Sequence, residues 1–484
     1  MSFRVPSVRR VVPPALSLST LAIVVTLAGC AYERYEPAPL DARRVPAARA
    51  AARLDDAAHG ALVARHAPQA PWPPREWSCR ELGLVAAARS GALARARAEL
   101  AAREAERAVA GQRPNPRVSV GVSYNSDQDP GDDNHYGIGP GFDYLWSPVD
   151  RRRIRVGQAD ARIVAARSAL LEAAWAARDR ACRAATALAA ARDADRAREA
   201  QVALLDEAVA LAETRARAGL ADAFEWQSLR LEANGARLDR LDRLARVTIS
   251  GAELAAALAL APAALGDVHL AARTDPGAWP SAPAIQTHAL SHHPRMLTAL
   301  AAYDEAERDL ELAIAAQYPD IELSPGYFFD QGDHLWSLVG GIVVPLFATQ
   351  KAAIAAAAAR RDAARAAVEQ VQGELVAGVE QAYAAWQAQR TLRAALAQTA
   401  AAVEDSIEAI ARQQADGLGD GLMLKRAELQ RAQVALRAVE VEAGYRRALL
   451  ALERAAALPF DGGSFADYLH ALYHEGARMA EEVR

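Results

Sequence analysis

Three histidines come nearest to a metal-ligand pattern in this chain of 484 residues. His288 and His292 are four residues apart, so a helix would place both imidazoles on one face, and His293 follows directly. Imidazole nitrogens are common zinc ligands. However, Pro294 interrupts the helix here, and no cysteine or carboxylate cluster adjoins the histidines. We therefore predict no metal site.

Two glycine-rich segments imitate nucleotide-binding loops. Residues 137–141 read Gly-Ile-Gly-Pro-Gly, but the lysine and the helix start of a phosphate loop are missing. Residues 417–421 read Gly-Leu-Gly-Asp-Gly and join two expected helices, whereas a dinucleotide loop joins a strand to a helix. No Ser/His/Asp arrangement stands out, and a net charge of −4 argues against nucleic acid as a partner. The sequence predicts a non-enzyme without a cofactor.

The amino-terminal segment has the three parts of a secretory signal. Basic residues open it, an apolar stretch runs from Leu16 to Leu27, and small residues precede Cys30. The run Leu-Ala-Gly-Cys at 27–30 resembles a bacterial lipobox, which implies that Cys30 is acylated and becomes the first mature residue. Ala31 follows it rather than Asp, which by the same resemblance favours the outer membrane. The alternatives are an ordinary signal peptide or a short anchor, although about 12 apolar residues are too few to span a bilayer.

After this segment the chain repeats itself. Each copy contains a medium helix, two short strands, a very long helix, a Gly-Asp turn and a second medium helix. The expected boundaries are 1–29 for the signal peptide, 30–79 for an extended Pro/Ala-rich tether, 80–265 for the first repeat, 266–284 for a linker, 285–458 for the second repeat and 459–484 for a tail. The medium helices are expected at 81–110, 223–260, 285–316 and 421–458. Cys79 and Cys182 are either small buried residues or one disulfide, which the sequence leaves open.

The very long helices, expected at 153–214 and 350–413, carry a coiled-coil pattern. In the second helix the apolar positions step by three and four residues, at Val368, Val371, Leu375, Val379, Ala382 and Trp386. A helix of about 62 residues would reach roughly 93 Å. Ordinary helices have about 11 residues. The pattern predicts long helical hairpins, and a solvated structural coiled coil remains an alternative.

Four segments switch to a period of two, at about 117–125, 136–146, 320–329 and 335–345. Apolar side chains alternate with small or polar ones, as in strands with lipid outside and water inside. The side chains expected to face lipid are Val118, Val120, Val122, Phe142, Tyr144, Tyr327 and Phe329. The register of the fourth segment is unclear, and Pro140 and Pro325 are unfavourable inside strands because proline lacks an N–H. Two hairpins packed on a soluble core are the alternative.

Four strands cannot close a membrane barrel, for which about eight is the smallest number. Open sheet edges are not tolerated in lipid, so spanning strands would require several chains to share one barrel. Two chains would supply eight strands and three would supply twelve. The sequence alone does not choose between them.

Several weak motifs, in the right order, resemble the TolC-type outer membrane efflux proteins over about residues 80–458. They are the lipobox, the duplicated plan, the Gly-Leu turns and the runs at 112–116, 293–297, 316–323 and 345–347. The resemblance implies a mainly α chain with a small membrane β part. Duplicated coiled-coil hairpins would form an α-barrel, and a homotrimer would share one 12-stranded β-barrel. It further implies a lipid-anchored duct in the Gram-negative outer membrane that extends into the periplasm. A periplasmic adaptor would couple the duct to an inner-membrane pump.

The resemblance also assigns roles to the hairpin turns. The tips that would dock the adaptor are Gly219, Leu220, Asp222, Gly417, Leu418 and Asp420. The alternative, which is compatible with docking, is that the two glycines are helix C-caps. Some relatives close the periplasmic mouth with two carboxylates, but Met423 and Arg426 occupy the corresponding places here. The candidate aperture therefore consists of Asp416, Asp420, Met423 and Arg426. Solvated turn residues or caps explain Asp416 and Asp420 equally well.

Two other functions fit parts of the pattern. A structural periplasmic lipoprotein would need the coiled coils but not the alternating strands. A duct for type I protein secretion would have the same architecture as an efflux duct. The sequence does not distinguish drug, metal-ion or polypeptide cargo, because the pump selects the substrate in such machines.

Overall fold

The computed structural model describes residues 33–66, 72–124, 126, 135–219, 222–266, 268–271, 280–330, 333–344, 350–416, 418 and 420–460. The expected signal peptide and Cys30 lie outside these residues. The chain divides into two units, Met1–Ala48 and Arg49–Arg484.

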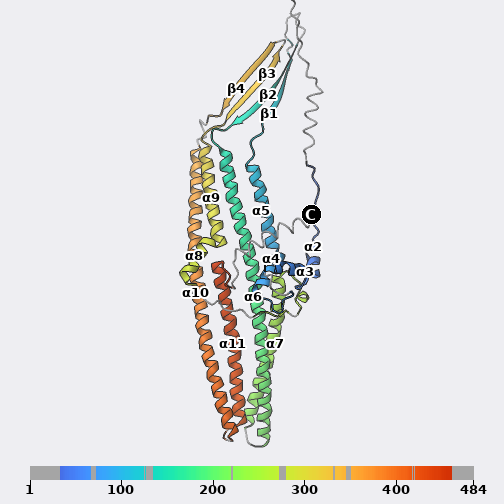
Figure 1. Cartoon of the computed structure of the whole chain (residues 1–484), viewed down its shortest axis with the longest axis vertical. Coiled ribbons are helices and arrows are strands. Elements are labelled where there is room, and N and C mark those ends of the chain that lie inside the picture. The colour runs from blue at the N-terminus through green and yellow to red at the C-terminus, as the bar shows by residue number, and fades with distance from the viewer. Residues whose placement is uncertain are drawn as a thin grey trace, which may run out of the picture. The chain divides into compact units, whose positions relative to one another are not determined.

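The described part of the chain is mainly helical and contains one sheet, as predicted (Figure 1). Its helices are α2 (Arg44–Ala51), α3 (Ala57–His66), α4 (Cys79–Arg89), α5 (Gly91–Ala110), α6 (Arg151–Arg217), α7 (Ala223–Ala257), α8 (Ala282–His292), α9 (Pro294–Ala315), α10 (Lys351–Ala415) and α11 (Gly421–Ala456), with a 3-10 turn at Pro262–Ala264. Its strands are β1 (Arg117–Tyr124), β2 (Tyr136–Trp146), β3 (Ile321–Asp330) and β4 (Asp333–Ile342). The sheet lies at one end of the long helices, and the α6–α7 and α10–α11 turns lie at the other end.

The two very long helices are present, with 67 residues in α6 and 65 in α10. Alanine is abundant in both, which favours helix and lets neighbouring helices approach closely. Four residues of the predicted seam of α10 are buried, namely Leu375, Val379, Ala382 and Trp386. Along its length α10 packs on α9 and α11, and α6 packs on α5, α7, α9 and α11. Each long helix therefore lies beside medium helices both in its half near the sheet and in its half near the turns.

The first medium helix of each repeat is broken. The interruption at Pro294 is the one expected from the sequence, whereas the break at Ser90 was not expected. Between α4 and α5 the Ser90 hydroxyl accepts a hydrogen bond from the Leu93 N–H at 3.3 Å, so Ser90 begins a new helix. Between α8 and α9 the break falls at His293, because Pro294 has no N–H to continue α8. The His293 imidazole accepts from the Arg295 N–H at 3.1 Å and caps α9. The two repeats therefore share this interruption of their first medium helix.

The expectation of an extended tether is wrong for two segments, because α2 and α3 are helical. Pro46 falls in the first turn of α2, where an N–H has no partner within the helix, and residues 47–67 contain no proline and are rich in alanine. Leu62 and Val63 of α3 are buried against Leu84 of α4. Burial of this apolar face explains why α3 is ordered against the body of the protein.

The four strands form one antiparallel sheet in the order β1-β2-β3-β4. The two prolines affect only the central ladder. Residues 139–140 and 142–143 of β2 have no partners in β3, although β2 pairs with β3 on both sides of them. Pro140 pairs with Val120 of β1, and Pro325 pairs with Leu338 of β4, so the outer ladders are continuous. None of the described helices combines the length and the apolar composition needed to cross a membrane.

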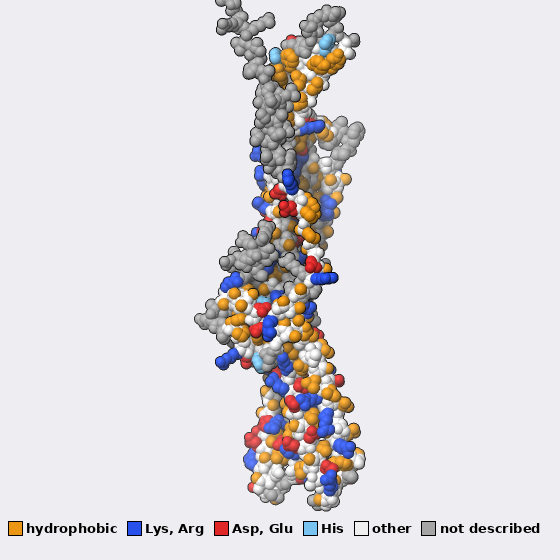
Figure 2. Space-filling view, turned by 90° about the vertical axis from the view of Figure 1, so that its right-hand side faces the viewer, with side chains coloured by type: hydrophobic (Ala, Val, Ile, Leu, Met, Phe, Trp, Pro, Cys, Tyr) orange, Lys and Arg blue, Asp and Glu red, His pale blue; other side chains and the backbone are white. Residues whose placement is uncertain are grey.

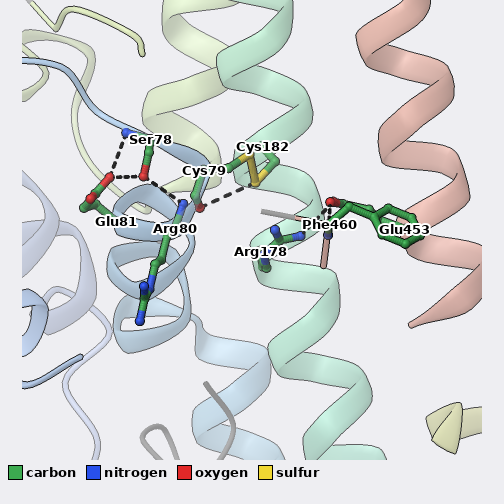
Figure 3. The surroundings of a disulfide bond; sticks show 8 residues. All are labelled: Ser78, Cys79, Arg80, Glu81, Arg178, Cys182, Glu453 and Phe460. Carbon is green, nitrogen blue, oxygen red and sulfur yellow. Dashed lines mark hydrogen bonds and ion pairs between the residues drawn. A yellow bond between two sulfur atoms is a disulfide. The ribbon is translucent and has the colours of Figure 1, made fainter. Parts of the chain in front are cut away.

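Cys79 and Cys182 form a disulfide that joins α4 to α6, with their Cα atoms 5.2 Å apart (Figure 3). The first turn of α4 is held by a capping box. The Ser78 N–H donates to the Glu81 carboxylate at 2.7 Å, and the Arg80 N–H donates to the Ser78 hydroxyl at 3.2 Å. The cap therefore fixes Cys79, the first residue of α4, against α6. The pairing that the sequence left open is made in the structure.

Replacing both Cys79 and Cys182 by serine is expected to lower the free energy of unfolding by about 2–5 kcal/mol. The physical reason is that the disulfide closes a loop between residues 103 positions apart. Thermal unfolding of the purified protein measures the effect. A reductant should shift the wild-type midpoint to that of the variant and leave the variant unchanged. A wild-type protein that reacts with a thiol reagent without reduction would show that the cysteines are unpaired.

Candidate membrane sheet and helix-hairpin tips

The register places the predicted apolar side chains on one face of the sheet. Val118 lies opposite Phe142, and Ile138 lies between Val122 and Phe329. Val120, in the middle of β1, is 55% exposed. Figure 2 shows orange side chains gathered at the sheet end and blue and red ones mixed along the helices. Large exposed apolar side chains of this face are Val118, Val120, Val122, Tyr124, Tyr136, Ile138, Phe142, Tyr144, Trp146 and Leu323.

The pairing with β3 settles the register of β4, which the sequence left unclear. Trp336 pairs with Tyr327 and Leu338 pairs with Pro325, so both lie on the apolar face. Trp336 is 81% exposed. This register could not be predicted because Leu335 and Val339, on the opposite face, are also apolar. We name the face that carries Val120 and Trp336 the apolar face.

The opposite face of the sheet is lined mainly by small and polar residues. Ser119 pairs with Gly141, and Ser337 pairs with Gly326. Phe328 is an exception, and its ring lies over Gly137 and Gly139. A Cβ added to either glycine would lie 2.6 Å from a ring carbon of Phe328. These glycines therefore make room for an aromatic ring on the small face.

Both outer strands of the sheet have an unpaired edge within the chain. β1 pairs only with β2, and β4 pairs only with β3, throughout the described sheet. An unpaired edge exposes a row of backbone N–H and C=O groups. In a hydrocarbon environment each of these groups would need a hydrogen-bond partner, and a neighbouring copy of the sheet would supply it.

At the other end of the molecule, the predicted tip residues lie in the two hairpin turns. Gly219 has a φ of +72°, a conformation that glycine adopts without strain. Asp222 and Asp420 cap the returning helices, since their carboxylates accept from the Phe224 N–H at 3.2 Å and the Leu422 N–H at 3.0 Å. Leu418 is 83% exposed. Leu220 and Gly417 lie outside the described residues.

Three ion pairs join the first hairpin to the second just above these turns. Arg215 pairs with Asp420 and Arg426 pairs with Glu225. The third links Lys425 to Glu207 at 2.7 Å. The hydrogen bond from Arg215 is the main reason why the pKa of Asp420 is lowered. Two candidate aperture residues, Asp420 and Arg426, are thus already paired, whereas Asp416 and Met423 are exposed.

The cationic and acidic partners of these pairs were not predicted from the sequence. Arg215, Glu207 and Glu225 belong to the first repeat, whereas Asp420 and Arg426 belong to the second. No local spacing could identify pairs separated by about two hundred residues. A buried apolar cluster that includes Leu205 of α6 and Leu422 of α11 lies next to them, so the hairpins also pack directly.

Reversing the charge of Arg426 is expected to loosen this contact between the hairpins. In Arg426→Glu a carboxylate would face Glu225, and each exposed pair contributes about 0.2–1 kcal/mol. Hydrogen exchange of the α7 and α11 amides near the tips should accelerate by up to about fivefold. The double swap E225R/R426E should restore the slow rate. Arg437→Glu, which faces Glu440 within α11, is the matched control. Equal exchange in Arg426→Glu and wild type would rule out a role for this pair.

The three histidines that the sequence singled out take part in a ring stack and a helix cap. The imidazoles of His288 and His292 stack with their centroids 4.6 Å apart. Burial, together with the nearby Arg295, lowers the pKa of His293 to about 4, so this helix-capping residue is neutral at neutral pH. Within the described ranges no three His, Cys, Asp or Glu side chains converge as metal ligands would.

Comparisons with known proteins support this architecture. The family profile described as "Outer membrane efflux protein" matches residues 84–260 and 286–458. No curated protein sequence matches the chain significantly.

Among solved structures, the outer membrane protein VceC from Vibrio cholerae is 19% identical, with a TM-score of 0.63. The alignment covers 80% of this chain and 96% of VceC. A membrane protein from Pseudomonas aeruginosa is 19% identical, with a TM-score of 0.62, and 78% of this chain and 93% of that one are covered. For the CmeC outer membrane channel of Campylobacter jejuni the identity is 13%, the TM-score 0.62 and the coverage 82% and 89%.

Proposed function

Because this chain belongs to the outer membrane efflux protein family, we propose that it is the outer membrane duct of a tripartite efflux system. Three copies assemble around one axis and share a 12-stranded β-barrel. Beneath it their long helices enclose a channel that opens toward the periplasm. The duct is passive, and an inner-membrane pump drives cargo into it through a periplasmic adaptor.

The observation that carries this proposal is the sheet. Its apolar face is exposed, its opposite face is mainly small and polar, and neither of its edges pairs with another strand among the described residues. A structural spacer does not need such a sheet. Closure with further copies would satisfy both edges, and the resemblance to trimeric family members favours three copies over two.

The surroundings of the protein follow from the same proposal. The disulfide between Cys79 and Cys182 is typical of an oxidising compartment such as the periplasm. We propose that Cys30 carries the lipid that anchors each chain in the outer membrane. The lipid-facing side chains are then Val118, Val120, Val122, Phe142, Tyr144, Tyr327 and Phe329.

We further propose that the hairpin turns dock the adaptor. The exposed side chains of Leu418, Phe224 and Met423 offer apolar contacts there. The docking residues are Gly219, Leu220, Asp222, Gly417, Leu418 and Asp420, and the mouth is lined by Asp416, Asp420, Met423 and Arg426. The three ion pairs between hairpins would hold the mouth in its resting shape.

Conductance of the purified protein in planar bilayers, together with its oligomeric mass, tests the proposal. We expect discrete channels from a particle of three chains. A protein that is monomeric in mild detergent and silent in bilayers would refute the duct.

A further inference from the structure

A groove rich in arginine lies where α6, α7 and α11 meet. It has a volume of about 920 Å³ and is lined by parts of α6 (180–194), α7 (243–257) and α11 (439–447). The α6 wall consists largely of alanine, including Ala187, Ala190 and Ala194. These short side chains leave the space open, and they make the α6 side of the groove, which we call its floor, apolar.

The groove opens on the side of α6 turned away from the α4 cluster. Ala181 and Ala185 of α6 are buried in the cluster that contains Leu82 and Val85 of α4. Arg183 and Ala187 in the groove each follow one of these alanines by two residues, which is about 200° around the helix. The groove and the α4 cluster therefore lie on opposite sides of the helical layer.

The charges around the groove are unbalanced. Five arginines line it, but Arg183 pairs with Asp179 at 2.8 Å and Arg243 with Asp239 at 2.9 Å. The other three are Arg180, Arg246 and Arg447, and within the described ranges no carboxylate forms an ion pair with any of them.

Two carboxylates also line the groove. Glu440 is engaged by Arg437 at 2.8 Å, which leaves Glu253 as the acidic side chain facing the three arginines. The groove is therefore positive above an apolar floor. An occupant of complementary chemistry has an anionic group and an apolar body.

We propose that this groove binds organic anions, that is, molecules in which a sulfonate, sulfate, carboxylate or phosphate is attached to an apolar ring or chain. Guanidinium groups bind such oxyanions through paired N–H donors. The site rests on the proposed function in one respect: in the assembled duct this side of α6 faces the channel. Anionic cargo would then pass a binding site about halfway along α6.

Equilibrium dialysis of the purified trimer against 2-naphthalenesulfonate tests the proposal, with detergent alone as the blank. The variant R180Q/R246Q/R447Q removes the three arginines of the groove. The matched control R95Q/R113Q/R155Q removes three exposed arginines elsewhere. The cation trimethyl(2-naphthyl)ammonium is the probe of opposite charge.

We expect the groove variant to bind the sulfonate at least about tenfold more weakly than wild type. The control variant should stay within about twofold, added salt should weaken binding, and the cation should bind at least about tenfold more weakly than the sulfonate. Equal sulfonate affinity in the groove variant and wild type would overturn the proposal. So would a trimer that does not bind the sulfonate, the result expected if a neighbouring copy fills the groove.

Channel conductance separates this inference from the proposed function. If wild type forms channels and the groove variant binds the sulfonate normally, the duct stands and the anion site fails. If wild type forms no channels but its sulfonate binding depends on the three arginines, the anion site stands and the duct fails.

Discussion

Glu453→Ala is expected to destabilise the protein by about 3–5 kcal/mol. Glu453 of α11 and Arg178 of α6 are 1% and 3% exposed, and their Oε2 and Nη1 atoms are 3.1 Å apart. The second carboxylate oxygen accepts a hydrogen bond from the Phe460 N–H at 2.6 Å. The substitution would remove the carboxylate that pairs with the buried guanidinium of Arg178 and accepts from the Phe460 N–H.

The midpoint of thermal unfolding measures this effect. The double variant R178M/E453L should lose much less stability than Glu453→Ala, because it removes both charges of the buried pair together. Glu440→Ala removes an exposed ion pair of the same helix and should change the free energy by less than about 1 kcal/mol. If Glu453→Ala and Glu440→Ala have the same midpoint of thermal unfolding, the buried pair does not hold the two repeats to each other.

Val120→Lys is expected to abolish assembly in the outer membrane. A lysine on the lipid side near the middle of a strand costs about 2–4 kcal/mol, and a trimer would incur this cost three times. Val120 is exposed and central in β1. Ser119→Lys is the control, since Ser119 precedes Val120 but points to the small, polar face.

The amount of trimer in isolated outer membranes measures this prediction. We expect trimer from Ser119→Lys and little or none from Val120→Lys. Normal trimer yield from Val120→Lys would mean that the apolar face does not meet lipid. Loss of trimer from both variants would mean that β1 does not tolerate a lysine on either face, so that the result would not show which face meets lipid.

Elements with a strong local period could be predicted from the sequence. The long helices and β1 have such a period, and Val118 and Val120 share a face as expected. β4 could not be oriented, because apolar residues occupy both of its faces and only pairing with β3 decides between them. The two helices in the expected tether, α2 and α3, were missed because the proline content of the whole segment was given more weight than the alanine-rich residues 47–67.

The contacts between repeats could not be predicted. Arg178 and Glu453, like Arg215 and Asp420, are far apart in sequence and meet only because α6 and α11 pack together. The break at Ser90 had a local signal, a serine before a glycine, that the helical period concealed. Cys79 and Cys182 are 103 residues apart in the sequence, and that number does not say how close they are in space. Tertiary packing decided the ion pairs and the cysteine pairing.

We propose that sheets from several chains close into one barrel, and crosslinking of the two sheet edges tests this closure. Within one chain β1 and β4 are three strand spacings apart, about 14 Å. A disulfide requires Cα atoms within about 7 Å, so a bond between these edges must join different chains. Each test protein carries Val120→Cys and one cysteine on the same face of β4, at His334, Trp336, Leu338 or Gly340.

Oxidation in outer membranes should give covalent dimers and trimers, with no larger species, for at least one of these cysteine pairs. The single variant Val120→Cys should give no trimer. If all four double variants run as monomers on a non-reducing gel, the sheets do not close into a shared barrel.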